Sequence, residues 1–545
     1  MNKHSRRKPH HPPSINTSSI FSSHTTARDI PLHHPCCAAQ LSMCSPSTAA
    51  SPAIAAMHDS PFLPPMAGKK PGFGSSEAEA EAAVDDVKSL FSLASPIAAA
   101  AIVLYLRSAV SMVFLGRLGD AELAGGSLAI GFANISGYSV LSGLALGMEP
   151  LCAQAFGASR HNHKQLSLTL HRAVVFLLAS SVPISLLWLN ACSILLFLRQ
   201  DRGISRIARA YLLSSLPDLA TNSFIHPIRI YLRAQRITHP VTIATLAGTL
   251  LHPLFNLLLV SRLRLGVAGV AAAAAASNLV VLLSLIAYVW AAGLHQPAPG
   301  RECLTGWQPL IRLAAPSCVS VCLEWWWYEI MILLCGLLGD PKPAVAAMGI
   351  LIQTTSLIYI FPSSLSLAVS TRVGNLLGGD RPDRARVLAA VALVVAAAVG
   401  VLAMAFAWGT RDSWGRFFSR DEEIRRLTAA ALPILGLCEL GNAPQTVACG
   451  VIRGTARPGK AANVNLAAFY LVGMPTAVGL GFGIGLGFRG LWLGLLSAQI
   501  SCAALMVYAV GSTDWGVEAE RAKALTSAVE CGGDEKQPLL SVVVA

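Results

Sequence analysis

One carboxylate stands among aromatic residues inside a long apolar stretch. Residues 322–329 read CLEWWWYE within the apolar run 310–338, so a helix of bilayer length would hold Glu324 near its centre. An ionised carboxylate there costs roughly 2.5–3.5 kcal/mol on insertion scales, which predicts a functional acid. It could exchange a proton, and in its ionised form it would attract an organic cation. The rings of Trp325, Trp326 and Tyr328 could then add cation–π contacts of about 0.5–2 kcal/mol each.

Helical geometry limits how many of these side chains share one cavity. Consecutive residues lie about 100° apart around a helix, so the whole aromatic run cannot face the same way. Glu329 follows Glu324 by five residues, which is about 140° around the helix, and we expect it to point elsewhere. Some of the rings are therefore expected to pack against lipid or other helices.

Other charged residues also lie at membrane depth. Glu439, Asp218 and Arg107 stand near the centres of their apolar segments. We pair Glu324 with Glu439 as the proton-coupling and substrate-binding acids. For Asp218 and Arg107, a structural role, as an ion pair or as side chains that snorkel to the membrane surface, and a functional role are equally favoured. Glu149 lies near a segment end, where water or a nearby arginine could satisfy it.

Composition restricts the class of protein. Of 545 residues, 54% are hydrophobic and only 13% charged, which indicates a membrane protein. The net charge of +12 comes largely from basic residues flanking apolar runs, so nucleic-acid binding is not indicated. The 13 cysteines are scattered, which predicts neither a disulfide framework nor a metal site. No phosphate-binding loop or hydrolase motif occurs, so we expect no enzyme and no cofactor. The expected energy source is a proton gradient, with a sodium gradient as the alternative.

Apolar segments of spanning length repeat in two halves. LASP at 93–96 matches LAAP at 313–316, and QAFGASR at 154–160 matches NLLGGDR at 375–381, at offsets of 220 and 221. An even number of helices in each unit gives a parallel repeat with a site between the halves. The fold class is thus an all-α integral membrane protein with twelve transmembrane helices in two pseudo-symmetric six-helix lobes. The expected spans are 92–116, 123–148, 173–198, 207–228, 241–260, 266–292, 310–338, 344–371, 387–408, 427–452, 461–486 and 490–511.

The ends of the chain are polar. We expect a disordered cytosolic tail at 1–88, lobes at 89–292 and 309–511, a cytosolic loop at 293–308 and a cytosolic tail at 512–545. Residues 1–65 could instead be a transit peptide or precede the true start. Basic residues in both tails place the termini in the cytosol. Glu535, Leu539 and Leu540 match an acidic dileucine pattern that resembles endosomal or vacuolar sorting signals, and the expected location is a vacuolar or endosomal membrane or the plasma membrane.

Three stretches of the sequence resemble the plant multidrug and toxic compound extrusion (MATE) family. They are residues 121–158, the CLEWWWYE motif, and LCELGNAPQT with GVIRGTARP at 437–458. The resemblance implies two six-helix lobes around a central cavity and efflux coupled to protons or sometimes sodium. It assigns proton coupling and substrate binding to Glu324. The helix 10 acid of many members falls on Asn442, one helical turn after Glu439. Asn134, Gln445 and Arg107 are further candidates for lining the cavity.

Together these features predict a secondary active antiporter. It would export organic compounds such as xenobiotics, metabolites or hormones in exchange for protons. The expected partners are the lipid bilayer and a small cationic or amphipathic substrate, and the expected state is a monomer. Two alternatives stay open: a lipid-linked flippase of the same superfamily, which should carry a lateral groove with a basic headgroup site, and a non-transporting membrane sensor.

Overall fold

The computed structural model describes residues 76–159, 163–294 and 300–530, with side chains for all but residues 76–83, 301 and 528–530. The proposed sorting motif at Glu535, Leu539 and Leu540 lies outside these residues, as do residues 1–65. Every regular element in the described ranges is a helix. Each of the twelve expected spans coincides with one helix or with a run of consecutive helices, which confirms the predicted fold class.

The first half of the chain forms the N-terminal lobe. Its second span is a run of consecutive helices from α2 to α4, with one π-helical turn. The elements of the N-terminal lobe are α1 Ser76–Leu118, α2 Asp120–Ala133, η2 Asn134–Tyr138, α3 Ser139–Leu146, α4 Met148–Ala158, α5 His163–Leu189, α6 Ala191–Phe197, α7 Arg202–Ser214, α8 Leu216–Ala234, α9 His239–Asn256, η3 Leu257–Arg262 and α10 Gly266–Ala291.

The second half forms the C-terminal lobe and one further helix. The short η4 precedes the lobe, and α18 follows its last span. The elements are η4 Arg301–Leu304, α11 Gln308–Cys335, α12 Pro341–Gly378, α13 Pro382–Trp414, η5 Gly415–Phe417, α14 Glu422–Gly454, α15 Pro458–Asn465, η6 Leu466–Gly473, α16 Met474–Val478, η7 Gly479–Gly483, α17 Gly487–Gly511 and α18 Trp515–Glu530.

The repeat is visible in how two equivalent helices begin. The side chain of Asp201 accepts hydrogen bonds from the backbone N–H groups at the start of α7, and Asp421 does the same for α14. Such caps satisfy donors that a helix cannot satisfy internally. The two aspartates are 220 residues apart, which is the offset of the repeat. The same local chemistry therefore starts the fourth span of each lobe.

Those two spans are also the most polar. Ten of the described helices are long and apolar enough to cross a membrane, and neither α7–α8 nor α14 is among them. Asp218, Arg229 and Arg233 lie on α8, while Glu439 and Arg453 lie on α14. In a membrane protein, helices with such residues face a protein interior or a water-filled cavity. The composition of α8 and α14 thus points to the space between the lobes.

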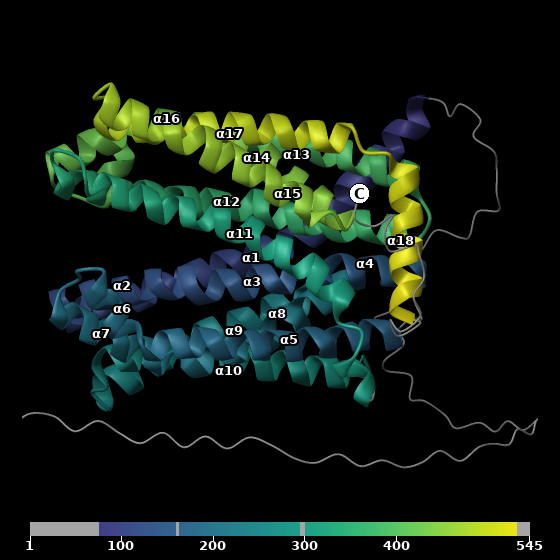
Figure 1. Cartoon of the computed structure of the whole chain (residues 1–545), viewed down its shortest axis with the longest axis horizontal. Helices are drawn as coiled ribbons and strands as arrows, with labels where there is room; N and C mark the ends of the chain where they lie inside the picture. The colour runs from purple at the N-terminus through teal and green to yellow at the C-terminus, as the bar shows by residue number, and fades with distance from the viewer. Residues whose placement is uncertain (1–75, 160–162, 295–299, 531–545) are drawn as a thin grey trace, which may run out of the picture. The chain divides into compact units, whose positions relative to one another are not determined.

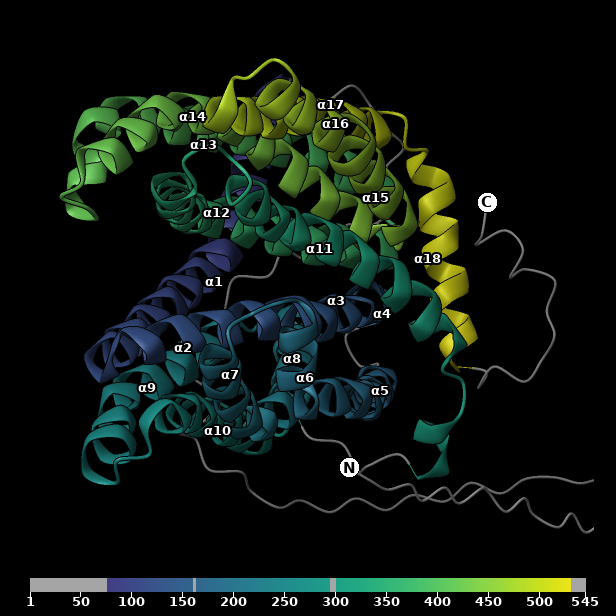
Figure 2. The same ribbon diagram turned by 60° about the vertical axis from the view of Figure 1, so that its left-hand side comes forward.

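Each lobe has its own apolar core. One cluster of buried residues joins α11–α17 with Leu90, Leu93 and Ala94 of α1 and with α18, and two others are built mostly from α1–α10. Figure 1 shows α11–α17 gathered in one layer and α2–α10 in another, and the turned view keeps the two groups apart (Figure 2). Because the two cores are separate, the lobes must be held together by specific contacts between them.

Reciprocal hydrogen bonds join the lobes. The amide of Gln154 on α4 donates to the carbonyl oxygen of Gly454 at 3.0 Å, at the end of α14. The amide of Asn375 on α12 donates to the carbonyl oxygen of Ala234 at 3.2 Å, at the end of α8. Gln154 and Asn375 are 221 residues apart, so one contact is the symmetry mate of the other. In each lobe, a side-chain amide thus caps the last turn of the polar helix of the other lobe.

Two glycines allow this close approach. A Cβ atom on Gly157 would overlap the backbone of Asn375, and one on Gly378 would overlap the backbone carbonyl of Gln154. Gly157 and Gly378 are also 221 residues apart. The backbones of α4 and α12 thus touch directly, with no room for a side chain on either glycine. We call this symmetric contact, made by Gln154, Asn375 and the two glycines, the closure contact.

Helix α18 lies across both lobes. Trp515, Ala519 and Ala522 pack into the C-terminal core, whereas Leu525 packs into the N-terminal one. Figure 1 shows the helix in yellow across the ends of both layers. The carboxylate of Glu518 pairs with Arg457 at 3.2 Å, so the helix is also tied to the C-terminal lobe by charge. The sequence predicted only a polar tail in this region.

The tight packing of the closure contact can be tested by adding a methyl group. Gly378→Ala places that group against the opposing backbone, and overpacking of this kind costs about 1–3 kcal/mol. We expect a lower thermal unfolding midpoint for the purified protein in detergent. Gly349→Ala is the matched control, because the space around Gly349 in the same helix is open. Equal midpoints for the two variants would contradict the tight packing described here.

Candidate functional site: a cavity between the lobes

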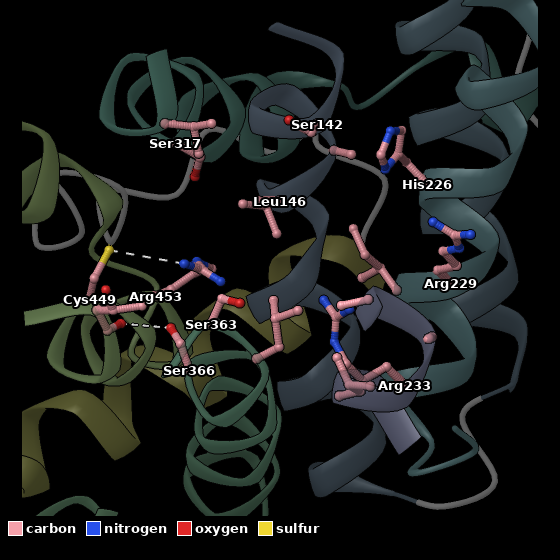
Figure 3. A pocket seen from close by; sticks show the side chains of 18 of the residues that line it. Ser142, Leu146, His226, Arg229, Arg233, Ser317, Ser363, Ser366, Cys449 and Arg453 are labelled. Carbon is pink, nitrogen blue, oxygen red and sulfur yellow. Dashed lines mark hydrogen bonds between the residues drawn. The ribbon is translucent and has the colours of Figure 1, made fainter. Parts of the chain in front are cut away.

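A cavity of about 340 Å³ lies between the two halves of the chain. The N-terminal wall comes from α1, α3, α8 and α9, and the C-terminal wall from α11, α12, α14 and α15. Most of its lining is apolar. Figure 3 shows polar side chains from both halves around it. Its ionisable lining residues are His226, Arg229, Arg233, Glu324, Tyr359, Cys449 and Arg453.

Glu324 lies in this lining, as the sequence predicted. Tyr359 and Arg453 interact electrostatically with its carboxyl group. The Tyr470 hydroxyl of η6 donates a hydrogen bond to the Leu323 carbonyl oxygen at 3.0 Å, which fixes the backbone of α11 next to Glu324. These interactions hold the acid at a defined place on the cavity wall.

Glu439 lies behind the wall and not in the lining. The residue is 1% exposed, and its carboxylate accepts a hydrogen bond from the Asn442 amide at 2.9 Å. Glu439 interacts electrostatically with Glu324, and Tyr328 interacts with both acids. Two carboxylates that interact in this way repel each other when both are ionised, so the charge on one affects the charge on the other. The pairing of Glu324 with Glu439, expected from the sequence, therefore has a physical basis.

The aromatic run divides among three environments. Trp325 lines the cavity with 42% of its surface exposed. The indole N–H of Trp326 donates to the Ile135 carbonyl oxygen of the N-terminal lobe at 3.2 Å. Trp327 is fully buried against Phe469 in the C-terminal core, and Tyr328 packs against the same core. Of the expected lining aromatics, the structure places Trp325 alone in the cavity wall.

Asp218 and Arg107 belong to a separate polar network. The Asp218 carboxylate accepts hydrogen bonds from the Tyr138 hydroxyl at 2.8 Å and from the Asn278 amide at 2.6 Å. Arg107 donates to the Asn278 side-chain oxygen at 2.6 Å. None of these residues lines the cavity. This arrangement supports a structural role for Asp218 and Arg107, and it satisfies both oxygens of the buried acid.

The remaining lining candidates also lie elsewhere. Asn134 begins the π-helical turn η2 and is partly buried. Gln445 is fully buried, and neither its amide nitrogen nor its oxygen has a hydrogen-bond partner among the described residues. The structure thus brings neither residue to the cavity wall.

Sequence reasoning missed an ion triad beside the cavity. Glu149 on α4 is 1% exposed and pairs with Arg233 at 3.2 Å and with Arg453 at 3.3 Å. The sequence suggested water or a nearby arginine as its partner, whereas the structure pairs it with two arginines that are distant in the chain. Arg233 and Arg453 are related by the 220-residue offset, which was the available signal. Because Arg453 belongs to the other lobe, the triad adds a charged link between the halves.

The described side chains include no cluster of three or more His, Cys, Asp or Glu that could hold a metal ion.

Two related helical lobes around a cavity, with charges at membrane depth in its wall, define a membrane transporter. The comparisons agree. The MatE family model matches residues 96–258 and 316–478, two segments offset by 220 at both ends. The chain belongs to the multidrug and toxic compound extrusion (MATE) family.

Relatives from Arabidopsis thaliana are close. Protein DETOXIFICATION 51 is 65% identical over 466 residues, covering 85% of this chain and 86% of the relative. Protein DETOXIFICATION 52 is 62% identical over 470 residues, covering 84% and 92%. The chain is therefore a secondary active efflux transporter and not an enzyme, and the flippase and sensor alternatives are not favoured.

Solved structures share the fold. The crystal structure of the eukaryotic MATE transporter AtDTX14 superposes with a TM-score of 0.78 at 30% identity, covering 82% of this chain and all of that one. The Vibrio cholerae MATE transporter VcmN in the bent form gives a TM-score of 0.70 at 17% identity, covering 82% and 99%, which is evidence for the fold alone.

The polar network around Asp218 can be tested by removing its acceptor. Asp218→Ala leaves the buried donors of Tyr138 and Asn278 unsatisfied, at about 1–3 kcal/mol each. We expect lower thermal stability of the purified protein. Tyr138→Phe should cost less in the Asp218→Ala background than in the wild type, since the shared bond is already gone. Strictly additive effects would rule out the coupling.

Proposed function

We propose that this transporter exchanges organic substrates for protons, with Glu324 as the group for which the two compete. The observation that carries the proposal is the pair of interacting carboxyl groups, one in the cavity wall and one buried behind it. Ionised Glu324 attracts a basic substrate, and a proton arriving on it removes that attraction. Glu439 modulates this exchange by repulsion, and Asn442 holds its carboxylate in place.

The closure contact suggests which state the lobes occupy. The beginning of α1 pairs Asp86 with Arg372 of α12, and α18 contacts α12 and α4. The two described chain ends therefore lie beside the same end of α12, which also carries the closure contact. We place this side in the cytosol, in line with the basic tails. The cavity would then be closed toward the cytosol and ready to exchange substrate for a proton on the other side.

Further features of the proposal concern the substrate, the membrane and the working unit. The exposed Trp325 ring beside Glu324 suits a substrate that is cationic or amphipathic. The dileucine motif supports a vacuolar or endosomal membrane, with the plasma membrane as the alternative. We propose tails at 1–88 and 512–545 flanking lobes at 89–292 and 309–511, and a monomer as the working unit.

The proton exchange can be measured in proteoliposomes. With ethidium as the probe cation and an imposed pH gradient, Glu324→Gln should lower uptake at least about tenfold, because one good charged interaction is worth about 1.5–3 kcal/mol. The pH dependence should flatten as well. Glu329→Gln is the control, since it lies on the same helix outside the cavity lining. Unchanged transport and pH dependence in Glu324→Gln would reject the mechanism. Uptake driven by a sodium gradient alone would reject the proton as the coupling ion.

The partner on α14 can be identified separately. We expect Glu439→Gln to shift the pH at which uptake is half-maximal, because it removes the repulsion between the two acids. Asn442→Ala should have a smaller effect, since it removes one hydrogen bond and leaves the carboxyl group. The comparison uses the same ethidium assay across a range of pH values. A larger loss in Asn442→Ala would transfer the partner role to Asn442.

A further inference from the structure

The N-terminal wall of the cavity carries an arginine without an acid. Arg229 on α8 lies in the lining, as Figure 3 shows, and donates one bond to the Thr245 hydroxyl at 3.3 Å. Its Nε atom is buried and has no hydrogen-bond partner among the described residues. No acidic side chain in the described part of the chain lies within ion-pair distance of it. Its charged neighbours, Arg107 and Arg233, are both cations.

The other charges around the cavity do not neutralise Arg229. Arg233 and Arg453 share the carboxylate of Glu149. Glu324 lies on the opposite lobe and interacts with Arg453. Three guanidinium groups therefore face two carboxylates, and the excess grows when Glu324 takes up a proton. A charge at membrane depth without a counterion is costly, which indicates that the counterion arrives with a ligand.

The repeat makes the two walls chemically opposite. At the offset of 220, Arg229 of the N-terminal lobe corresponds to Cys449, and Glu324 of the C-terminal lobe corresponds to Leu104. All four residues line the same cavity. The shared ancestry of the halves gives these positions the same depth, but their chemistry has diverged. One wall presents a base and the other an acid.

We propose that the cavity binds amphoteric organic molecules, with an anionic group at Arg229 and a basic group at Glu324. The anionic group would be a carboxylate, sulfate or phosphate, which the planar guanidinium binds with two parallel donors. The apolar lining, including Leu104 and Leu146, contacts the body of the molecule between the charged ends. This inference rests on the proposed function for Glu324, and it adds Arg229 as a specificity-determining residue.

The anion subsite is tested by ligand binding to the full-length protein in detergent. Thermal unfolding is followed against hexanoate and its neutral isostere hexanamide at matched ionic strength. We expect hexanoate to bind the wild type more tightly than hexanamide. Arg229→Gln should weaken hexanoate binding about 10- to 100-fold. Arg264→Gln, at an exposed position outside the cavity lining, is the control and should bind hexanoate like the wild type.

The amphoteric class is tested with 6-aminohexanoate, which adds a basic group to the same chain. We expect it to bind the wild type more tightly than hexanoate, and Glu324→Gln should abolish that preference while hexanoate binding persists. Hexanoate binding that is absent, or equal in Arg229→Gln, overturns the anion subsite. Equal binding of the two acids to the wild type overturns the amphoteric class. Failure of proton coupling would appear in transport and not in the Arg229 comparison, so the two proposals fail separately.

Discussion

The cost of a charge at membrane depth determines how the polar residues of this protein are arranged. A guanidinium or carboxylate in that environment is retained when it is paired, hydrogen-bonded or used. Glu149 is neutralised between Arg233 and Arg453, and Asp218 is satisfied by Tyr138 and Asn278. These groups hold helices together. Glu324 and Arg229 lack dedicated ion-pair partners of this kind among the described residues, and both line the cavity.

Arg453 connects the cavity to the contact between the lobes. It interacts with Glu324 on one side and pairs with Glu149 of the other lobe on the other. In the proposed cycle, ionised Glu324 competes with Glu149 for this guanidinium, whereas protonated Glu324 leaves it to Glu149. The protonation of one residue thus changes the strength of a link between the halves. That is a direct electrostatic route from proton binding to the packing of the lobes.

The sequence was sufficient to predict structural features whose signal is local or periodic. Apolar segment length predicted the helices, the offsets of 220 and 221 predicted the lobes, and the helical spacing correctly separated the rings of the aromatic run. The sequence was insufficient to predict contacts between residues that are distant in the chain. Glu149 and Arg453 are far apart in sequence, and nothing near Glu149 indicates the pairing. Helix α18 was missed because its apolar residues are few and gain stability only by packing against two lobes at once.

The two halves of the chain keep related residues at the closure contact and differ at the functional positions. Positions of the closure contact keep related residues in both halves: glycine at 157 and 378, and a carboxamide at 154 and 375. A symmetric contact needs the same small or amide side chains on both sides. The functional positions have diverged instead. Glu149 corresponds to Ser370, whose buried hydroxyl has no hydrogen-bond partner among the described residues. Because Arg233 and Arg453 are themselves related by the repeat, the single acid Glu149 binds the equivalent arginine of each lobe and serves both halves.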